Sequence, residues 1–229
     1  MYHQFKELAD IDITTAPMEV GPTCHYMMGG VRVDSDTQQS TIPGLFAAGE
    51  VAGGMHGANR LGGNSLSDLV VFGMLAGRYA AEYSTASGSP ALVPEEVLDG
   101  HAEEALAPFD EHGEENPYSI QNDLQECMSG LVGIIRTESE MLEALDRLEV
   151  LKERLARVHV EGHRQYNPGW HLALDLRSLL AVSECIARAA LERQESRGAQ
   201  TRDDFPTTDE QWGKRRVVIS QQDGEVVVS

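Results

Sequence analysis

The spacing of apolar residues divides the chain into a first part with short extended pieces and a second part rich in helices. Within the first forty residues, β-prone pieces such as 31–33 alternate with glycine and proline turns, and 42–51 forms a short apolar run. A glycine-rich stretch follows, and from Leu66 the apolar residues recur every three or four positions until about Tyr83. This order predicts strand, glycine-rich loop and helix.

The break at residues 87–94, which is rich in serine and proline, is the best candidate boundary because the helical spacing stops there and resumes after it. The apolar spacing beyond it predicts four helices that pack as an antiparallel bundle. Their starts are marked by Pro94, by Asn116-Pro117, by a capping box of Thr137 with Glu140, and by Asn167-Pro168. After Gly198 the chain is polar and irregular, apart from two β-prone stretches at 216–220 and 225–228.

Charge narrows the possible partners. The formal net charge of −19 at pH 7 would repel a phosphate backbone, so nucleic acid is not expected as a partner. No Lys or Arg occurs between Arg78 and Arg136, whereas acidic residues recur through that interval. We interpret this acidic interval as a solvated face; the alternative is a surface for a basic partner subunit.

Cysteine usage and hydropathy argue against a disulfide-rich protein, a cysteine metal site and a membrane-spanning protein. Cys24, Cys127 and Cys185 are odd in number, far apart and without a CxxC pair, so neither a disulfide framework nor a metal site is predicted, and a reducing compartment fits best. The longest run without a polar or charged residue, Leu69–Gly77, is about half of a bilayer span, and no basic leader precedes an apolar stretch at the start. We expect neither a transmembrane helix nor a signal peptide.

Residues 50–66, EVAGGMHGANRLGGNSL, have the composition of an anion site. Glycines let backbone N–H groups approach a ligand, and Ser65 lies near the N-cap of a helix whose first turn offers unpaired donors. Arg60 can grip a carboxylate or phosphate with two hydrogen bonds. The alternative is a flexible loop in which Ser65 is only a cap and Arg60 only a surface charge, and composition leaves both interpretations open.

His25 lies in the segment PTCHYMMGG, beside a tyrosine and two methionines. Such a histidine is more often a core or surface residue than a catalytic one, so its neighbours alone give it no function. The order of the motifs is more informative. PTCHYMMGG, GLFAAGE, HGANRLGGNSLSDLVVFG, a helical stretch and ESRGAQTRDDFP with DEQW resemble the flavoprotein subunit of succinate dehydrogenase and fumarate reductase over essentially all 229 residues.

The resemblance implies FAD as the cofactor and a four-carbon dicarboxylate, succinate or fumarate, as the substrate. His25 matches a family histidine that hydrogen-bonds a substrate carboxylate, and Arg60 matches an arginine that clamps one. Glu50 matches an acid that contacts FAD at a sugar or ribityl hydroxyl. Ser65 and Leu66 match the pair at a helix start near the flavin pyrimidine ring, where the helix dipole stabilises negative charge.

His56 and Asn59 lie in the same loop and are expected to shape it, with a purely structural role as the alternative. No catalytic residue is expected in this chain. The family's proton-shuttle arginine, its GxGxxG and the histidine that in many members holds FAD covalently belong to a segment before Met1, and no GxGxxG occurs here. We therefore expect the chain to be inactive alone.

One position departs from the family pattern. Relatives usually read RGAH where this chain has Gln200, and a glutamine keeps a hydrogen-bonding group but takes up no proton near neutral pH. Any role of that family histidine is therefore in doubt here. Arg197 and Arg202 keep the pattern, with structural pairing to nearby acids as the alternative reading.

The expected fold class is α+β. It comprises the C-terminal part of an FAD-binding α/β domain, with short strands, a glycine-rich loop and a helix, then an antiparallel helical bundle and an irregular tail. The expected domains are 1–28 as the end of a capping-domain segment, 29–88 as the C-terminal part of the FAD-binding domain, 89–196 as the helical bundle and 197–229 as the tail.

The resemblance also implies partners and a location. An iron–sulfur subunit of the same complex, and through it a membrane anchor, would place the chain in the cytoplasm, peripheral on the inner face of the cell membrane. An L-aspartate oxidase-like flavoprotein is one alternative, although LVVFG and the acidic helical region favour the dehydrogenase branch. The other alternative is a helical module, from about Pro94 onward, that docks an iron–sulfur subunit or an assembly factor.

Overall fold

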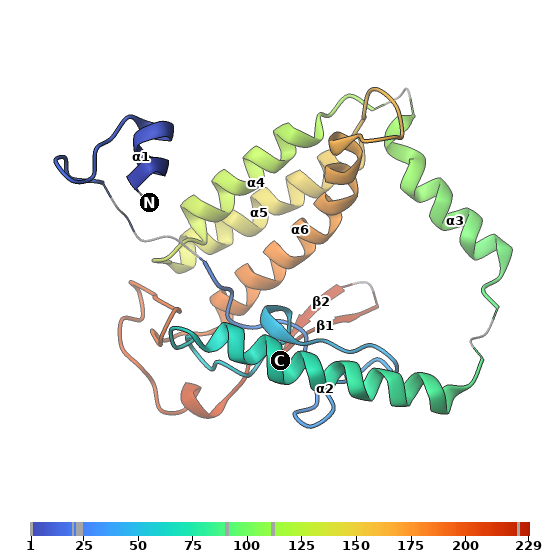
Figure 1. Cartoon of the computed structure of the whole chain (residues 1–229), viewed down its shortest axis with the longest axis horizontal. Helices are drawn as coiled ribbons and strands as arrows, with labels where there is room; N and C mark the ends of the chain where they lie inside the picture. The colour runs from blue at the N-terminus through green and yellow to red at the C-terminus, as the bar shows by residue number, and fades with distance from the viewer. Residues whose placement is uncertain (1, 20, 22–24, 90–91, 111–112, 224) are drawn as a thin grey trace.

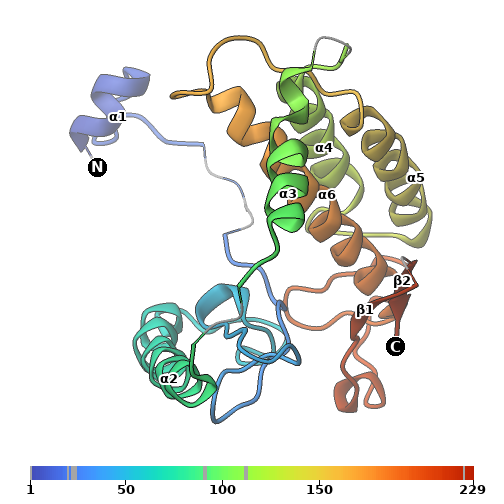
Figure 2. The same ribbon diagram turned by 90° about the vertical axis from the view of Figure 1, so that its right-hand side faces the viewer.

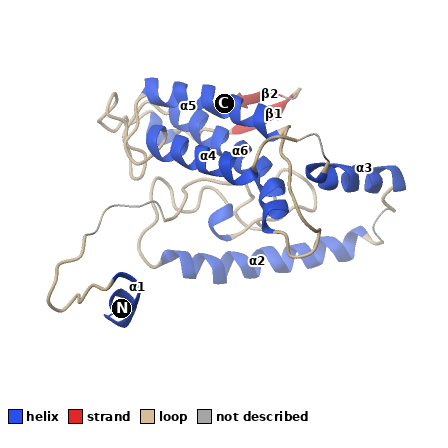
Figure 3. Ribbon diagram, turned by 90° about the horizontal axis from the view of Figure 1, so that it is seen from above, coloured by secondary structure: helices blue, strands red, loops and turns tan. Residues whose placement is uncertain are grey.

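The computed structural model of the chain describes residues 2–19, 21, 25–89, 92–110, 113–223 and 225–229. Three helices, α4 (Pro117–Leu131), α5 (Glu138–Leu155) and α6 (Pro168–Glu192), lie side by side as a bundle (Figure 1). Helix α2 (Asn64–Ser87) runs apart from this bundle, with irregular loops between the two (Figure 3). The described structure is thus mainly helical, with a layer of loops that carries the HYMMGG motif and the glycine-rich stretch before α2.

The remaining elements are short. They are α1 (Tyr2–Ala9), the 3₁₀ turns η1 (Gly49–Val51), η2 (Ala107–Phe109) and η3 (Trp212–Lys214), helix α3 (Glu95–Leu106), and strands β1 (Ile219–Gln222) and β2 (Glu225–Val228). The two strands pair as an antiparallel hairpin near α6 (Figure 2). This confirms the second predicted β-prone stretch at 225–228, whereas the first strand begins three residues later than the predicted 216–220 stretch.

Each bundle helix begins at a side-chain cap. Asn116, Thr137 and Asn167 accept hydrogen bonds from backbone N–H groups in the first turns of α4, α5 and α6. Pro117 and Pro168 occupy the first helical positions, where no N–H donor is needed. The predicted starts of these three helices are therefore confirmed, because the capping residues act locally.

The bundle encloses the main hydrophobic core. Ile120 of α4, Met141 and Leu148 of α5, and Leu176 of α6 are completely buried. The other buried members of this core are Leu124, Cys127, Val132, Ala144, Leu151, Val158, Val160, Leu172, Ala173, Leu180, Ala187 and Ala190. Among the described residues, this cluster therefore contains all the buried hydrophobic residues except Ala52.

The C-terminal tail closes one end of the bundle. Arg202 is completely buried, and its guanidinium donates to the carbonyl groups of Ala190 and Leu191 at the end of α6 while it pairs with Asp204. A cation at a helix C-terminus neutralises the partial negative charge of the unpaired carbonyl groups. The tail is therefore irregular in outline but firmly bonded to α6.

Three segments differ from the prediction. The first forty residues contain α1, which was not predicted, and the expected extended pieces pair only through single bridges such as Val31 with Ala52 and Val33 with Ser40. The end of the apolar run is the 3₁₀ turn η1 rather than a strand. Helix α3 begins as predicted but has no buried residue and stands outside the bundle (Figure 1). Local signals predicted where α3 begins. The sequence did not show that α3 would lie outside the bundle, because packing depends on residues that are distant in sequence.

Candidate functional site

The segment that follows His25 and the glycine-rich loop are joined by backbone hydrogen bonds. The Val31 N–H donates to the Val51 carbonyl at 2.8 Å, and the Gly53 N–H donates to the Val31 carbonyl at 2.9 Å. Gly30 has φ +132°, and a Cβ atom there would lie 2.2 Å from the Val51 carbonyl oxygen, so a larger residue does not fit. The glycine pair of HYMMGG thus allows the two segments to pass closely.

Glu50 strengthens the same junction. Its Oε1 accepts a hydrogen bond from the Met27 backbone N–H at 2.8 Å, across 23 residues of chain. The residue is otherwise exposed. One carboxylate oxygen therefore holds the segment that carries His25 against η1, and an acceptor remains accessible to a ligand.

A polar cluster lies between the His25 segment, the loop and α2. The Tyr26 hydroxyl donates to Asp68 Oδ2 at 3.3 Å, and His56 Nε2 lies 3.1 Å from the same oxygen. The rings of Tyr26 and His56 meet edge to face with centroids 5.4 Å apart. Burial, followed by the negative charge of Asp68, raises the pKa of the Tyr26 hydroxyl, which therefore stays protonated at neutral pH.

His25 and Arg60 both lie against the Tyr26 ring. The Arg60 Cζ lies 4.5 Å from the ring centroid, in cation–π geometry, and the His25 and Tyr26 ring centroids are 6.5 Å apart. Among the described residues, no carboxylate pairs with Arg60, whose Nη1 donates only a long 3.4 Å hydrogen bond to the Leu61 carbonyl. His25 is exposed. The two predicted substrate ligands thus share one aromatic neighbour.

Ser65 and Leu66 lie in the first turn of α2, as predicted, but Ser65 is not a cap. The N-cap is Gly63, with φ 85°, and no side chain accepts from the first N–H groups of the helix. Ideal Cβ atoms at Gly57, Gly62 and Gly63 would meet nothing within 4 Å. A helix N-terminus without a side-chain cap, beside open space, is suited to a ligand that accepts hydrogen bonds. Leu66 is 71% exposed there.

The tail touches the glycine-rich loop. The Ala199 N–H donates to the Ala58 carbonyl at 2.9 Å, and Gly198, at φ +61°, passes so closely that a Cβ atom would lie 2.5 Å from the same oxygen. Next to it, the Gln200 amide accepts from Arg136 at 2.7 Å and donates to the Ala190 carbonyl at 3.1 Å. The glutamine that replaces the family histidine therefore bridges two parts of the bundle without a titratable group.

Arg197 and Arg202 make structural pairs. Arg197 binds the buried carboxylate of Glu195, which Arg193 also contacts, and Arg202 binds Asp204. Hydrogen bonds from Arg197 lower the pKa of Glu195 to about 2. This is the structural alternative that the sequence left open for both arginines.

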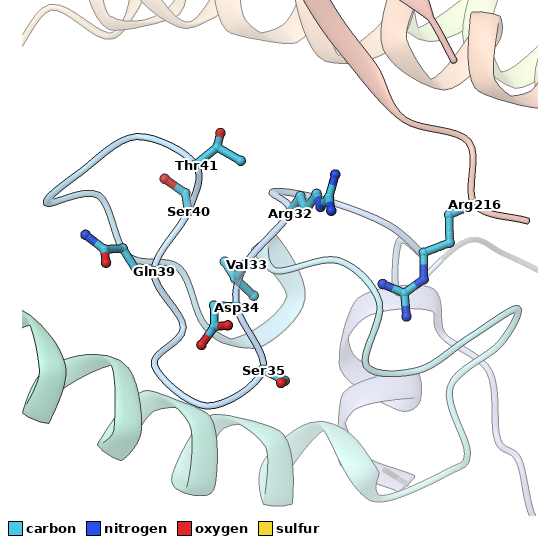
Figure 4. A pocket seen from close by; sticks show the side chains of 8 residues that line it. All are labelled: Arg32, Val33, Asp34, Ser35, Gln39, Ser40, Thr41 and Arg216. Carbon is cyan, nitrogen blue, oxygen red and sulfur yellow. The ribbon is translucent and has the colours of Figure 1, made fainter.

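An open hollow lies away from these residues. It has a volume of about 520 Å³ and is lined by Arg32, Val33, Asp34, Ser35, Gln39, Ser40, Thr41 and Arg216 (Figure 4). None of the predicted site residues lines it. The Asp34 carboxylate accepts hydrogen bonds from the backbone and side chain of Thr37, and these bonds lower its pKa. The carboxylate thus has its hydrogen-bond partners within its own turn. The hollow is a feature of the turn rather than part of the site.

Metal-binding clusters and membrane-spanning helices are both absent from the described part of the chain. No group of three or more His, Cys, Asp or Glu side chains there could hold a metal ion. No helix among the described residues is long and apolar enough to cross a bilayer. Cys24 lies outside the described residues, while Cys127 is buried and burial raises the pKa of its thiol.

Comparisons with known proteins show which family the chain resembles. A family model described as "FAD binding domain" matches residues 1–66, and one described as "Fumarate reductase flavoprotein C-term" matches residues 121–229. The chain is 38% identical over 207 residues to the fumarate reductase flavoprotein subunit of Escherichia coli, a match that covers 89% of this chain and 34% of that protein. It is 36% identical over 233 residues to the succinate dehydrogenase flavoprotein subunit of Coxiella burnetii, with 96% and 39% covered.

The solved structures agree as well. A structure of Mycobacterium smegmatis Sdh1 in complex with UQ1 superposes with a TM-score of 0.91 and 55% identity, over 100% of this chain and 39% of that one. The glycine-rich loop, the open helix N-terminus and the matched domain define an FAD-binding flavoprotein. Within that class, the chain belongs to the flavoprotein subunits of succinate dehydrogenase and fumarate reductase. It spans about a third to two fifths of the length of these relatives.

No role was assigned to Asp68 or Tyr26 from the sequence, and the contact between Gly198 and Ala58 was not predicted. A signal for Asp68 was present, since it is a lone acid within the apolar helix of SLSDLVVFG. A single charge in such a helix either faces solvent or has a buried polar partner. The contact with the tail joins residues 140 positions apart, and nothing in local sequence indicates it.

Proposed function

We propose that this chain provides the dicarboxylate anchors and part of the FAD site of a succinate:acceptor oxidoreductase, which interconverts succinate and fumarate. One observation carries the proposal. The Arg60 guanidinium carbon lies 4.5 Å from the centroid of the Tyr26 ring, which His25 also contacts, and no described carboxylate pairs with Arg60. An arginine held in this way offers the edge of its guanidinium for a bidentate grip on a carboxylate.

His25 supplies the second anchor. An imidazole that contacts the same tyrosine ring as the arginine can donate a hydrogen bond to the other carboxylate of a four-carbon diacid. Binding both carboxylates orients the substrate and draws charge from the carbon–carbon bond between them. In this proposal the proton shuttle lies outside the chain, and His25 and Arg60 bind and orient without transferring the proton.

Glu50, Ser65 and Leu66 are proposed to face FAD. Glu50 has an acceptor for a cofactor hydroxyl, and the N–H groups in the first turn of α2 offer donors and partial positive charge. The open space beside Gly62 and Gly63 is compatible with a planar group. FAD supplies the hydride chemistry of this enzyme class when bound.

We also propose domain boundaries at residues 28, 88 and 196, and an iron–sulfur subunit as a partner. We infer that electrons pass to an iron–sulfur subunit and that membrane association is peripheral, through partner subunits. The bundle of α4, α5 and α6 supports a docking role because it has its own core. A pull-down of an iron–sulfur subunit by residues 94–229 tests this role, and failure of that piece to bind would remove it.

Succinate titration of the ¹⁵N-labelled chain, followed by NMR at arginine side chains, tests the proposed site. Wild type should bind succinate more tightly than butyrate, which has one carboxylate. Arg60→Ala and His25→Ala should each weaken succinate binding by about tenfold or more. Equal binding of succinate by wild type and Arg60→Ala would overturn the proposal. Tighter binding of aspartate than succinate would favour the L-aspartate oxidase alternative.

Turnover is a separate expectation. The purified 229-residue chain with added FAD should not reduce a dye in a succinate-dependent manner, because the proposed proton shuttle and the dinucleotide fold lie outside it. Robust succinate-dependent dye reduction by the chain alone would show that it contains a complete catalytic site.

A further inference from the structure

Helix α2 buries one residue, and that residue is charged. The structure describes every residue from Asn64 to Ser87, and among them Asp68 alone is buried, with 4% exposure. Desolvating a carboxylate is unfavourable unless hydrogen bonds or charges compensate. Its Oδ2 has two partners, Tyr26 and His56, while its Oδ1 has none among the described residues. Because this buried carboxylate is only partly compensated, we look for a role beyond solubility in the contacts that Asp68 makes.

The partners of Asp68 connect it to Arg60. Tyr26 directs its hydroxyl to Asp68 and its ring face to the Arg60 guanidinium, which lies 4.5 Å away. A negative charge at the hydroxyl increases electron density in the ring and so strengthens its attraction for a cation. His56 meets the Tyr26 ring edge to face and bonds the same carboxylate oxygen, so the ring is fixed from two directions.

The arrangement differs from a direct ion pair in one useful respect. A carboxylate bonded to Arg60 would occupy the edge of the guanidinium, where its N–H groups point. The Tyr26 ring instead contacts the guanidinium without a carboxylate, with Cζ 4.5 Å from the ring centroid. Negative charge from Asp68 therefore acts on the arginine indirectly, and no described carboxylate competes with an incoming anion for its N–H groups.

We propose that Tyr26, His56 and Asp68 form a positioning unit that holds the Arg60 guanidinium flat and directs its N–H edge to a carboxylate ligand. This rests on the proposed function, because it assigns the unit to the same dicarboxylate site. Tyr26 is the positioning residue in contact with Arg60, while His56 and Asp68 act through Tyr26. None of the three touches the reacting atoms in this assignment.

The test is the same succinate titration, with two readouts. The first is the dissociation constant for succinate. The second is the ¹H shift of Arg60 Nε–H, which the Tyr26 ring current moves upfield only while the guanidinium is stacked. Tyr26→Leu removes the ring, Tyr26→Met removes it at closer side-chain volume, and Tyr26→Phe keeps the ring without the hydroxyl. Tyr83→Leu, at another tyrosine in edge contact with a phenylalanine, is the matched control.

Tyr26→Leu and Tyr26→Met should lose the upfield shift and bind succinate about tenfold more weakly, whereas Tyr26→Phe, which keeps the ring but loses the hydroxyl bonded to Asp68, should keep part of the shift and bind about threefold more weakly. Tyr83→Leu should change neither readout. The proposal is overturned if Arg60→Ala loses binding but the ring-less Tyr26 variants bind as tightly as wild type. If Arg60→Ala also binds normally, the proposed function itself fails, and the positioning role fails with it.

Discussion

At the scale of single residues, Glu195 is a buried carboxylate that two arginines bind. Its side chain is fully buried and receives hydrogen bonds from Arg197 and Arg193, and Arg197 is the main cause of the lowered pKa of about 2, against an ordinary value of 4.5. A lowered folded-state pKa means that stability is fully present above pH 4.5 and is lost as pH falls toward 2.

Glu195→Gln should therefore lower the free energy of unfolding by about 3 kcal/mol at pH 7. At pH 3 the difference from wild type should shrink to about half or less, because the wild-type carboxylate has lost much of its advantage. Urea unfolding at both pH values measures the two differences. Glu210→Gln, at an exposed glutamate of the tail, is the control, and an equal difference at both pH values for Glu195→Gln would contradict the ion-pair account.

Gly198 allows a second prediction at this scale. It combines φ +61° with a close approach to the Ala58 carbonyl, whereas Gly57 has a similar φ of +57° and open space around it. Gly57→Ala should cost only the backbone strain, about 1 kcal/mol. Gly198→Ala should cost at least about twice as much and should speed hydrogen exchange of the Ala199 amide. Similar costs for both substitutions would mean that the contact between tail and loop is weak.

At the scale of elements, helix α5 separates core from surface clearly. Leu148 is completely buried between α4 and α6, whereas Leu142 on the same helix is 47% exposed. Leu148→Ala should lower the free energy of unfolding by about 2–5 kcal/mol, since it leaves a cavity in a packed bundle. Leu142→Ala should cost less than about 1 kcal/mol. Denaturant unfolding of both variants checks the difference, and comparable losses would show that the bundle is packed differently.

The sequence predicted the elements whose signals are local. Asn116, Thr137 and Asn167 act on N–H groups two or three residues away, so their helix starts were legible. Helix α1 has apolar residues at Tyr2, Phe5 and Leu8, but it is only eight residues long and buries none of them, so its short pattern gave no clear helix signal. The extended pieces near Val31 were predicted as strands, but they lack long partners and pair only by bridges.

For the candidate site, the motifs pointed to segments that meet in the structure, and the roles of their residues stay predictions. Family motifs assigned roles to His25, Arg60 and Glu50, and the structure brings their segments together around Tyr26 and Met27. Chemistry alone left the loop undecided between anion site and plain connector. The lone acid Asp68 in an apolar helix indicated a buried polar partner or an exposed face, but its partners Tyr26 and His56 and the tail contact could not be derived, because they depend on residues that are distant in sequence.

At the scale of the whole molecule, α2 presents an exposed apolar stripe. Leu66, Val70 and Met74, spaced four residues apart on one helix face, are 71%, 73% and 57% exposed. Apolar patches of this kind mark interaction surfaces. This chain covers only 39% of the Coxiella burnetii relative and 34% of the Escherichia coli one, so a covering segment is expected in the longer proteins.

The double substitution Val70→Thr with Met74→Gln should therefore reduce binding of a hydrophobic dye to the isolated chain without lowering its melting temperature. Val150→Thr, at a 55% exposed position on α5, should change dye binding little because it removes no contiguous stripe. Unchanged dye fluorescence in the double variant would show that the stripe is not the accessible apolar surface.

The central claim is that Arg60 and His25 anchor a dicarboxylate beside FAD. The most direct test replaces the matching segment of Mycobacterium smegmatis Sdh1, 55% identical, with this chain and measures succinate-dependent dye reduction together with FAD content. The chimera should be active, and Arg60→Ala within it should lower kcat/KM for succinate by about a hundredfold or more at unchanged FAD content. An Arg60→Ala chimera that keeps the kcat/KM of its parent would contradict the claim.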